Sequence, residues 1–325
     1  MEKAVYWFQK AADQGLTKAQ INLGVMYLSG KGVTKDRTQA LRWIQKVVAS
    51  ASPPSESTIG YVLSPKESNL ISYMINEEVS GLARGADTLY EEMIEDTIRF
   101  VTSVDVAKEY EKNQVAADQK YFKKRLIVSG KIKSINSGLD NSPYVLLQGN
   151  HSLMDPQAHF DDSQTQKVAL LKKGEDLVLA CEGNGAVIGV PMFANCIFKD
   201  KFIQQLKKEV SLKIGDFFNG RLVEDYYQMS ALCGLLFARW LPDNSPCLMS
   251  LGDSNQKVCE GEVHKMLEQR KVLVSEGEFV SDVISLLAIL SSKGVKVQTE
   301  KLVDRLLAKE SSEEKDNQKG SDAVK

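Results

Sequence analysis

Apolar and polar residues alternate with a period of two through the middle of the chain. Within Arg125–Ile135, the residues Leu126, Val128 and Ile132 fall on one side, which predicts a half-buried strand. Further strands are expected at Tyr144–Leu147, Pro156–Phe160, Leu177–Leu179 and Pro191–Phe198. A brief helix over Ser163–Leu171 should end near Gly174, because glycine is common just after a helix.

Five strands with a helix between the third and the fourth follow the order of an OB-type β-barrel. The hydrophobic period changes to that of helices on both sides of this region. The pattern therefore predicts a multi-domain α+β protein. It has an α-helical N-terminal segment, a five-stranded OB-type barrel and a C-terminal all-α segment.

Helices are expected at several places outside the barrel. Ser64, Pro65 and Glu67 have the order of an N-cap and first turn. Apolar helical faces follow at Leu70–Leu82 and at Leu89, Met93, Ile94, Ile98 and Val101, and a helix over 104–120 leads into the barrel. Behind the barrel, helices are expected at Leu222–Trp240, Val258–Arg270, Phe279–Leu290 and Thr299–Ala308.

These patterns divide the chain into five segments. They are repeats over 1–49, a linker with helices over 50–104, the barrel domain over 105–200, a helical domain over 201–308, and a disordered tail over 309–325. With 325 residues, a net charge of −2 and 43% hydrophobic residues, the composition is typical of a soluble protein with two or three domains. No apolar run approaches the roughly 20 residues that span a bilayer.

The N-terminal segment contains an internal repeat. Ala4–Lys10 recurs as Ala40–Lys46, an offset of 36 residues, and AQINLGVMYLSGKGVTKD (Ala19–Asp36) lies between. The pattern resembles the Sel1-like repeat, a helix–turn–helix relative of the tetratricopeptide unit. Matching positions include Leu23, Gly24, Tyr27, Gly30, Gly32, Ala40 and Trp43. The resemblance implies a solenoid that contacts a protein partner, and we expect Trp7, Tyr27 and Trp43 to pack between repeats.

Met1 falls inside a repeat unit, and solenoids generally need about three units to bury their faces. We therefore expect that the chain lacks its true start and that further repeats lie upstream. Residues 1–20 contain no apolar signal region. The periplasm or cell envelope is favoured if the true N-terminus is missing, and the cytoplasm otherwise.

Several short motifs in the middle of the chain occur in a recognisable order. They are EYEKNQVAADQKY (Glu109–Tyr121), VSGKI (Val128–Ile132), LLKKGEDLVLACEG (Leu170–Gly183) and ANCIF (Ala194–Phe198). Together they resemble the tRNA_anti-like family of bacterial OB-fold domains over about 106–198. The resemblance implies the fold and carries over no catalytic residue.

The barrel segment is close to electrically neutral. Between 121 and 200 there are nine basic and eight acidic residues. Proteins that bind single strands need a basic groove lined with aromatic rings, so nucleic acid is an unlikely partner. The alternative function is a cytoplasmic single-stranded nucleic-acid binder that uses the face around Lys123–Lys133.

Catalytic and metal-binding patterns give little support for an enzyme. HSLMDPQAHFDD (His151–Asp162) concentrates histidine and aspartate, but its spacing fits no standard metal motif, and a polar loop is the simpler interpretation. Ser254 and Lys257 fit S-x-x-K without the companion motifs. We expect no catalytic residues, no metal and no cofactor.

Five cysteines are present, and none forms a C-x-x-C pair. Cys181 follows the apolar side of the fourth strand, and Cys196 shares a face with Met192 and Phe198 in the fifth. An antiparallel turn rich in glycine would place the two cysteines opposite each other. We favour a structural disulfide, and a pair of buried thiols is the alternative.

Taken together, the sequence predicts a non-enzymatic scaffold or binding protein of the bacterial cell envelope. The Sel1-like repeats would contact a protein partner, and the barrel would add a recognition or spacer module. A hydrolase that uses the His151–Asp162 loop is the least favoured alternative.

Overall fold

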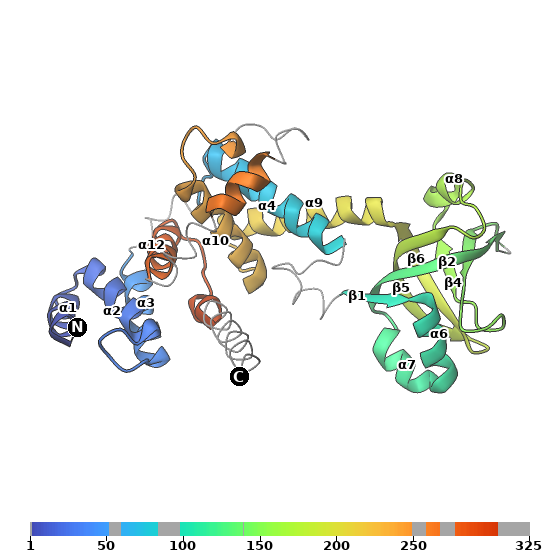
Figure 1. Ribbon diagram of the computed structural model, residues 1–325, viewed down its shortest axis with the longest axis horizontal. Coiled ribbons are helices and arrows are strands. Elements are labelled where there is room, and N and C mark those ends of the chain that lie inside the picture. Colours follow the sequence, from blue (N-terminus) through green and yellow to red (C-terminus); the bar gives the residue numbers. More distant parts are fainter. Residues whose placement is uncertain are drawn as a thin grey trace, which may run out of the picture. The chain divides into compact units, whose positions relative to one another are not determined.

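The computed structural model describes residues 2–51, 60–83, 98–138, 140–248, 258–266 and 277–304 (Figure 1). Two compact units divide the chain. One joins Met1–Glu77 to Glu209–Lys325, and the other is Glu78–Lys208. The predicted tail over 309–325 and the Ser254–Lys257 motif lie outside the described residues.

A closed five-stranded barrel forms the centre of the second unit. Its strands are β2 (Arg125–Ser137), β3 (Pro143–Leu147), β4 (Gln157–Phe160), β5 (Asp176–Val187) and β6 (Val190–Phe198). The order β2-β3-β4-β6-β5 closes because β5 also pairs with β2, and β4 runs parallel to β6. Between β4 and β5 lie the short helices η1 (Asp162–Gln164) and α8 (Thr165–Val168). The predicted OB-type topology is confirmed.

The strand β1 (Ile98–Thr102) corrects the helical prediction for this segment. It pairs in parallel with the first residues of β2, from Ile98 opposite Arg125 to Thr102 opposite Ser129. Ile98 and Val101 have helical spacing, but the chain gains ladder hydrogen bonds by extending the sheet instead. Leu89, Met93 and Ile94 lie outside the described residues.

Two helices replace the single helix expected over 104–120. They are α6 (Ser103–Lys112) and α7 (Gln114–Tyr121), and Asn113 between them is extended, with φ −163°. The Asn113 side chain accepts a hydrogen bond from the amide of Ala116 and so begins α7 as its N-cap.

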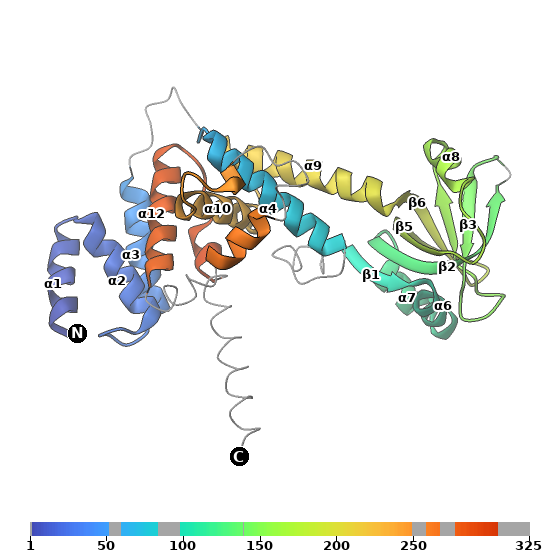
Figure 2. The same ribbon diagram turned by 45° about the horizontal axis from the view of Figure 1, so that its top comes forward.

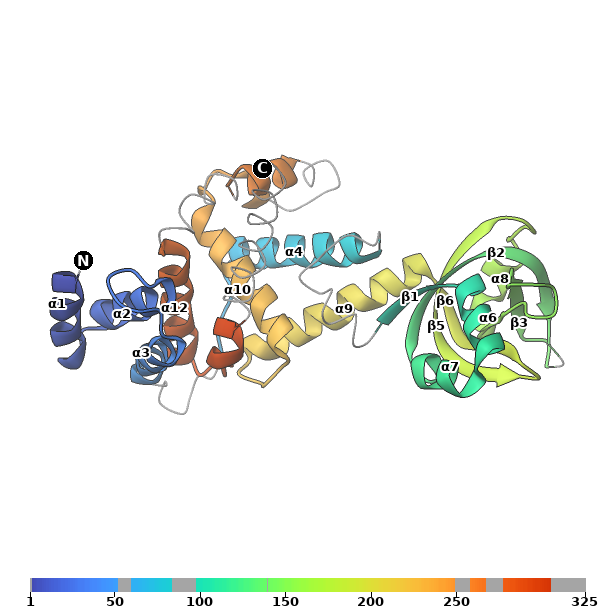
Figure 3. The same ribbon diagram turned by 60° about the horizontal axis from the view of Figure 1, so that its bottom comes forward.

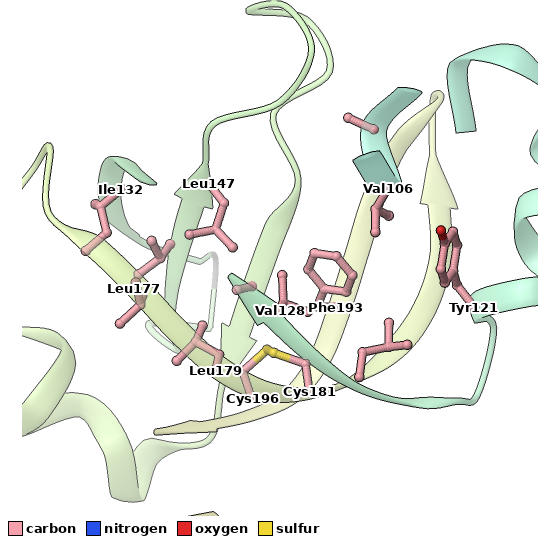
Figure 4. Packing of buried hydrophobic residues seen from close by; sticks show 14 of the residues in the cluster. Val106, Tyr121, Val128, Ile132, Leu147, Leu177, Leu179, Cys181, Phe193 and Cys196 are labelled. Atoms are coloured by element: carbon pink, nitrogen blue, oxygen red, sulfur yellow. A yellow bond between two sulfur atoms is a disulfide. The ribbon is translucent and has the colours of Figure 1, made fainter. Parts of the chain in front are cut away.

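The apolar faces of α6 and α7 belong to the barrel core (Figure 4). Val106, Tyr110 and Tyr121 are buried together with Leu126, Val128, Leu179 and Phe193 from the strands. Gly183 lets α7 approach β5, because a Cβ there would lie 2.0 Å from the carbonyl oxygen of Tyr121. The helix pair is thus an integral part of the barrel domain.

A bulge in β6 decides which of its residues face the core. The pairing of β5 and β6 shifts between Ala180 and Glu182, and Asn195 has a positive φ of 52°. Asn195 is exposed while Phe193 and Cys196 are both buried, so the inward positions change register at the bulge. Met192 is only half-buried and lies outside the core cluster, which corrects its predicted placement beside Cys196.

Helices make up the described part of the first unit. Their bounds are α1 (Glu2–Asp13), α2 (Thr17–Ser29), α3 (Arg37–Ser50), α4 (Pro65–Ala83), α9 (Lys199–Phe218), α10 (Asp225–Trp240), η2 (Pro246–Leu248) and α12 (Glu278–Ser292). Residues 258–266 and 299–304 are also helical. α4 and α9 each cross the boundary between the units.

The first three helices form the repeat segment. Gly30 ends α2 in the left-handed region at φ 73°, and Asp36 begins α3 by accepting a hydrogen bond from the amide of Gln39. A Cβ at Gly24 would lie 3.2 Å from Cγ1 of Ile44, so glycine allows close contact between α2 and α3. α12 then packs on this pair and also contacts α10 (Figures 2 and 3).

Candidate functional site

The outer face of β3 and β4 is the part of an OB barrel that binds ligands most often. In this chain Tyr144 on β3 lies opposite His159 on β4, and Asn136 on β2 lies opposite Tyr144. The rings of Tyr144 and His159 are nearly parallel, at 15°, with centroids 5.0 Å apart. All three side chains are half-buried, so they form a surface that a ligand can still reach.

A second row of side chains lies two residues along the same strands. Leu146 on β3 pairs with Ser134 on β2 and with Gln157 on β4, and Gln157 pairs with Met192 on β6. We call these two rows the β3–β4 face; its members are Ser134, Asn136, Tyr144, Leu146, Gln157, His159 and Met192. It combines aromatic and aliphatic surface with neutral amides and a hydroxyl.

Hydrogen bonds hold the polar groups of the β3–β4 face in place. The Asn136 amide donates to the Ser134 hydroxyl at 2.9 Å, and the His159 ring lies 3.2 Å from the Gln157 side-chain oxygen. Burial lowers the pKa of His159, while the nearby Asp140 carboxylate acts in the opposite direction. His159 is therefore neutral near pH 7 and can serve as a hydrogen-bond donor or acceptor.

Two charged groups beside the β3–β4 face already have partners. The Lys133 ammonium lies 2.6 Å from the carboxylate of Asp155, which also accepts a hydrogen bond from the amide of Gly149. Asp140 accepts hydrogen bonds from the hydroxyl and amide of Ser142, and these bonds lower its pKa. The face therefore offers little net charge to a ligand.

Two basic residues of Lys123–Lys133 contact other groups of the barrel domain. The guanidinium of Arg125 lies over the ring of Phe202, and Lys133 is paired with Asp155. Lys123 lies in a turn before β2, with φ 56°, and Lys133 lies within β2. Two of the basic residues in Lys123–Lys133 are therefore engaged within the domain.

The structure disperses the residues of the His151–Asp162 loop. His151 pairs with Glu111 at 3.2 Å, whereas His159 stacks on Tyr144. Asp155 holds Lys133, and Asp161 caps η1 through the amide of Ser163. Among the described residues no group of three or more His, Cys, Asp or Glu side chains converges in a way that could hold a metal.

The motif at Glu109–Tyr121 joins α6 to α7. Lys120 lies 2.6 Å from Glu109, and the Tyr110 hydroxyl donates to Asp118 at 2.9 Å. Burial disfavours the charge on Glu109, but hydrogen bonds from Lys120 and Tyr121 outweigh it and hold its pKa below the usual value. These contacts stabilise the helix pair α6 and α7 in the barrel domain.

Two disulfides are present among the described cysteines. Cys181 in β5 is bonded to Cys196 in β6, with Cα atoms 4.1 Å apart (Figure 4). Cys247 in η2 is bonded to Cys259, with Cα atoms 4.7 Å apart. The second disulfide was not among the predictions from the sequence. Cys233 is the described cysteine without a disulfide.

A second exposed surface lies on α1. Tyr6 is 53% exposed and Trp7 is 65% exposed, and their rings are 5.4 Å apart in an edge contact. The ammonium of Lys10 lies 4.6 Å from the Tyr6 ring centroid. We call Tyr6, Trp7 and Lys10 the α1 face. A shallow, open depression nearby is lined by Glu2, Lys3, Gly30, Gly32, Val33 and Thr34.

The other repeat residues lie where the repeat pattern predicts packing, with Trp7 as the exception. Trp43 is 5% exposed and packs with Ala12, Ala19 and Leu23 from α1 and α2. Tyr27 packs partly against the same cluster, and Ala40 is fully buried. Trp7 lies in α1, the first described helix, so the helices that cover Trp43 have no counterpart over Trp7 in the described residues. Its place between repeats stays a prediction.

The chain matches two family models. The Sel1 repeat model matches residues 1–16 and 17–46, and the tRNA_anti-like model matches residues 70–197. The chain therefore has Sel1 repeats at its N-terminus and a tRNA_anti-like domain in the middle. No curated protein matches the chain. Within the described ranges no helix has the length and hydropathy to cross a membrane.

One solved structure resembles part of the chain. It is a crystal structure from Klebsiella pneumoniae described as a "putative nucleic acid-binding lipoprotein". The similarity has a TM-score of 0.27 and 18% identity, and it covers 33% of this chain and 95% of that one. A likeness at this level assigns no ligand to this chain.

Proposed function

We propose that the chain is a non-enzymatic binding protein that docks a protein partner on its α1 face and carries the barrel as a second recognition module. Sel1 repeats are found in proteins that contact other proteins, and the barrel is of a type that binds ligands on its outer surface. The observation that best supports the docking role is the match of residues 1–16 and 17–46 to the Sel1 repeat, and Trp7 is exposed among the described residues.

The packing of α12 favours α1 as the docking side. Ile284 on α12 and the buried Val303 join a cluster with Leu41, Ile44 and Val47 of α3. This contact covers the α3 side of the repeat segment, so another solenoid helix cannot stack there in the same way. Large aromatic side chains exposed on the opposite side are the kind of residue that dominates protein interfaces.

The non-enzymatic assignment rests on the contacts of the most reactive side chains. His151 is held by Glu111, His159 by Tyr144 and Gln157, and Asp155 by Lys133. These pairings engage the side chains of His151, His159 and Asp155 in contacts within the domain.

We also propose that the protein works in an oxidising compartment such as the bacterial cell envelope. Two disulfides support this, since disulfides persist in secreted and envelope proteins and are rare in the cytosol. Alkylation of thiols in intact cells, followed by peptide mapping, tests the location. Labelling of all five cysteines without reduction would contradict it.

Photo-crosslinking tests the docking role. A benzophenone amino acid would replace Trp7 in one variant and Val115, which is 71% exposed in the barrel domain, in a control variant. We expect a discrete adduct from position 7 and none from position 115. The partner identified in that adduct, once purified, should bind the unmodified chain and bind Trp7→Ser about tenfold more weakly or worse. Equal binding to Trp7→Ser would contradict the docking role.

A further inference from the structure

One end of the barrel presents three aliphatic side chains to solvent. Val187 and Ile188 lie at the turn between β5 and β6, where Ile188 is 99% exposed, and Leu153 lies in the loop that leads into β4 and is 79% exposed. Because β4 and β6 are parallel neighbours, this loop and this turn enter the barrel from the same end. A Cβ on Gly189 would lie 4.0 Å from the sulfur of Met154, which follows Leu153. We call Leu153, Val187 and Ile188 the barrel tip.

The segments that form the barrel tip lack acidic and strongly basic residues. Neither Gln148–Met154 nor Gly183–Phe198 contains an aspartate, glutamate, lysine or arginine. The exposed Lys123 and Lys124 are set back from the tip, since their backbones hydrogen-bond to Gly183. Gly183 comes five residues before Ile188, or about 16 Å along an extended strand. The foremost part of this end is therefore apolar.

The charges behind the barrel tip are mixed in sign. Besides the two lysines there is Asp118, whose carboxylate would lie 3.6 Å from a Cβ on Gly185. Glu111 is a second acid at this end, and it pairs with His151 at 3.2 Å in the loop before β4. Acids and bases together give no strong attraction to an anionic surface. Contact through this end of the barrel therefore depends mainly on the aliphatic side chains.

Isoleucine at position 188 is unfavourable for the barrel domain by itself. Its φ of 53° lies in the left-handed region, which β-branched residues disfavour. Its almost complete exposure also leaves the side chain in water, where apolar surface is costly. Transfer of the side chain to an apolar medium would reverse the second of these effects.

The size and composition of the barrel tip favour a lipid bilayer over a protein partner. Three aliphatic side chains offer a few hundred Å² at most, whereas a stable protein interface takes about 800 Å² from each partner. The tip also lacks the aromatic rings and arginines that dominate protein interfaces. Hydrocarbon requires no complementary shape. Insertion by about 5–10 Å would bury the three side chains and keep the peptide groups of the turn among the hydrated headgroups.

We propose that the barrel tip inserts shallowly into the surface of a phospholipid bilayer, with Ile188 deepest and with Val187 and Leu153 beside it. The barrel domain would then be held at a membrane by two turns of one end. This contact is separate from the α1 face and does not depend on docking there.

The test mixes the full-length chain with vesicles of phosphatidylethanolamine and phosphatidylglycerol and measures flotation with the vesicles. We expect the chain to float, and the bound fraction to change little between low and high salt, because apolar insertion is not screened. Ile188→Trp adds a fluorescent ring to the tip, whereas the three native tryptophans lie at 7, 43 and 240, outside the barrel. Brominated acyl chains should quench the added emission, and leave that of Leu170→Trp unquenched.

Polar variants then connect flotation to the barrel tip. Ile188→Asn and Leu153→Asn should each weaken vesicle binding about tenfold. Leu170→Asn is the matched control, because Leu170 is also 79% exposed but precedes β5 at the other end of that strand, and it should bind as the unmodified chain does. Circular dichroism verifies that each variant folds, and Ile188→Gly and Leu153→Ser serve in place of any that does not.

Three results would overturn the proposal. Absence of flotation at any salt concentration would reject a membrane contact. Flotation that is lost at high salt, or that survives the combined change Ile188→Asn and Leu153→Asn, would replace insertion of the tip by adsorption through other residues. A dimer in sedimentation equilibrium that Ile188→Asn dissociates would give the tip to a second copy of the chain.

Discussion

Trp7 and Trp43 occupy the same position in successive repeats, yet Trp7 is 65% exposed and Trp43 is 5% exposed. The same contrast holds for Ala4, which is exposed, and Ala40, which is buried. Equivalent positions of the repeat are thus covered by other helices in α3 and exposed to solvent in α1. The side chains of Tyr6 and Trp7 on the α1 face are therefore exposed among the described residues.

Truncation of Trp43 should destabilise the fold, whereas truncation of Trp7 should leave its stability nearly unchanged. Trp43→Ala removes a buried ring from the cluster with Leu23 and should lower the free energy of unfolding by about 3–5 kcal/mol. Trp7→Ala should change it by less than about 0.5 kcal/mol, because the side chain is exposed. Chemical denaturation of both variants checks this; a large loss from Trp7→Ala would mean that the ring supports the fold.

The disulfides should leave one thiol in the native chain. Denatured but unreduced protein should react with one equivalent of maleimide, at Cys233, and reduced protein with five. Cys181→Ala combined with Cys196→Ala should lower the free energy of unfolding by about 3 kcal/mol, since the bond closes a loop between residues 15 apart. The same double change at Cys247 and Cys259 is the matched comparison. Three or more reactive thiols before reduction would contradict the pairing.

Burial of His159 predicts a dependence of stability on pH. Its pKa is lower in the folded chain than the usual value of about 6.5, so the unfolded chain takes up this proton first as the pH falls. Its contribution to stability is therefore complete above the unfolded pKa and declines as the pH falls through that value towards the folded pKa. His159→Gln should show a shallower decline between about pH 8 and pH 5 in denaturation experiments. An NMR titration that gives His159 a pKa above 6.5 would refute this.

The hairpin turn between β5 and β6 holds an unfavourable residue. Val187 pairs with Val190, so Ile188 and Gly189 form a two-residue turn, with positive φ of 53° and 80°. Ile188 is 99% exposed and β-branched, and such residues are strained at positive φ. Ile188→Asn should therefore raise the free energy of unfolding by about 1 kcal/mol.

Val187→Asn serves as the control for the turn, since Val187 lies in the strand and not in the left-handed region. It should give no gain in thermal stability. If both variants stabilise the barrel equally, removal of exposed apolar surface, and not relief of backbone strain, is the cause.

Local pattern was enough to predict the barrel. Leu126, Val128 and Leu179 lie in the barrel core, and their strands formed at the apolar segments where strands were predicted. Ile98 and Val101 were wrongly assigned to a helix, because two apolar residues with helical spacing are also compatible with a strand. The decisive factor was the partner β2, which lies far along the chain. Met192 was misplaced because one bulged residue, Asn195, reverses the period-two pattern beyond it.

The candidate surfaces depended on contacts between distant residues. The stacking of His159 on Tyr144 depends on the register of β3 and β4, which the sequence pattern alone does not determine. The residues of α12 and α3 that pack together are more than two hundred positions apart, so no local sequence pattern predicts this contact. Trp7 has the repeat position of a core residue, and its exposure among the described residues does not follow from the repeat pattern.

Accessibility of position 7 in the working protein tests the docking account most directly. Trp7→Cys, with Val115→Cys as the control, would be labelled with a membrane-permeant maleimide in purified protein and in the cells that produce it, and quantified by peptide mapping. The account predicts that position 7 reacts rapidly in the purified chain and severalfold more slowly in cells, while position 115 reacts alike in both. Equally rapid labelling of position 7 in both settings would contradict it.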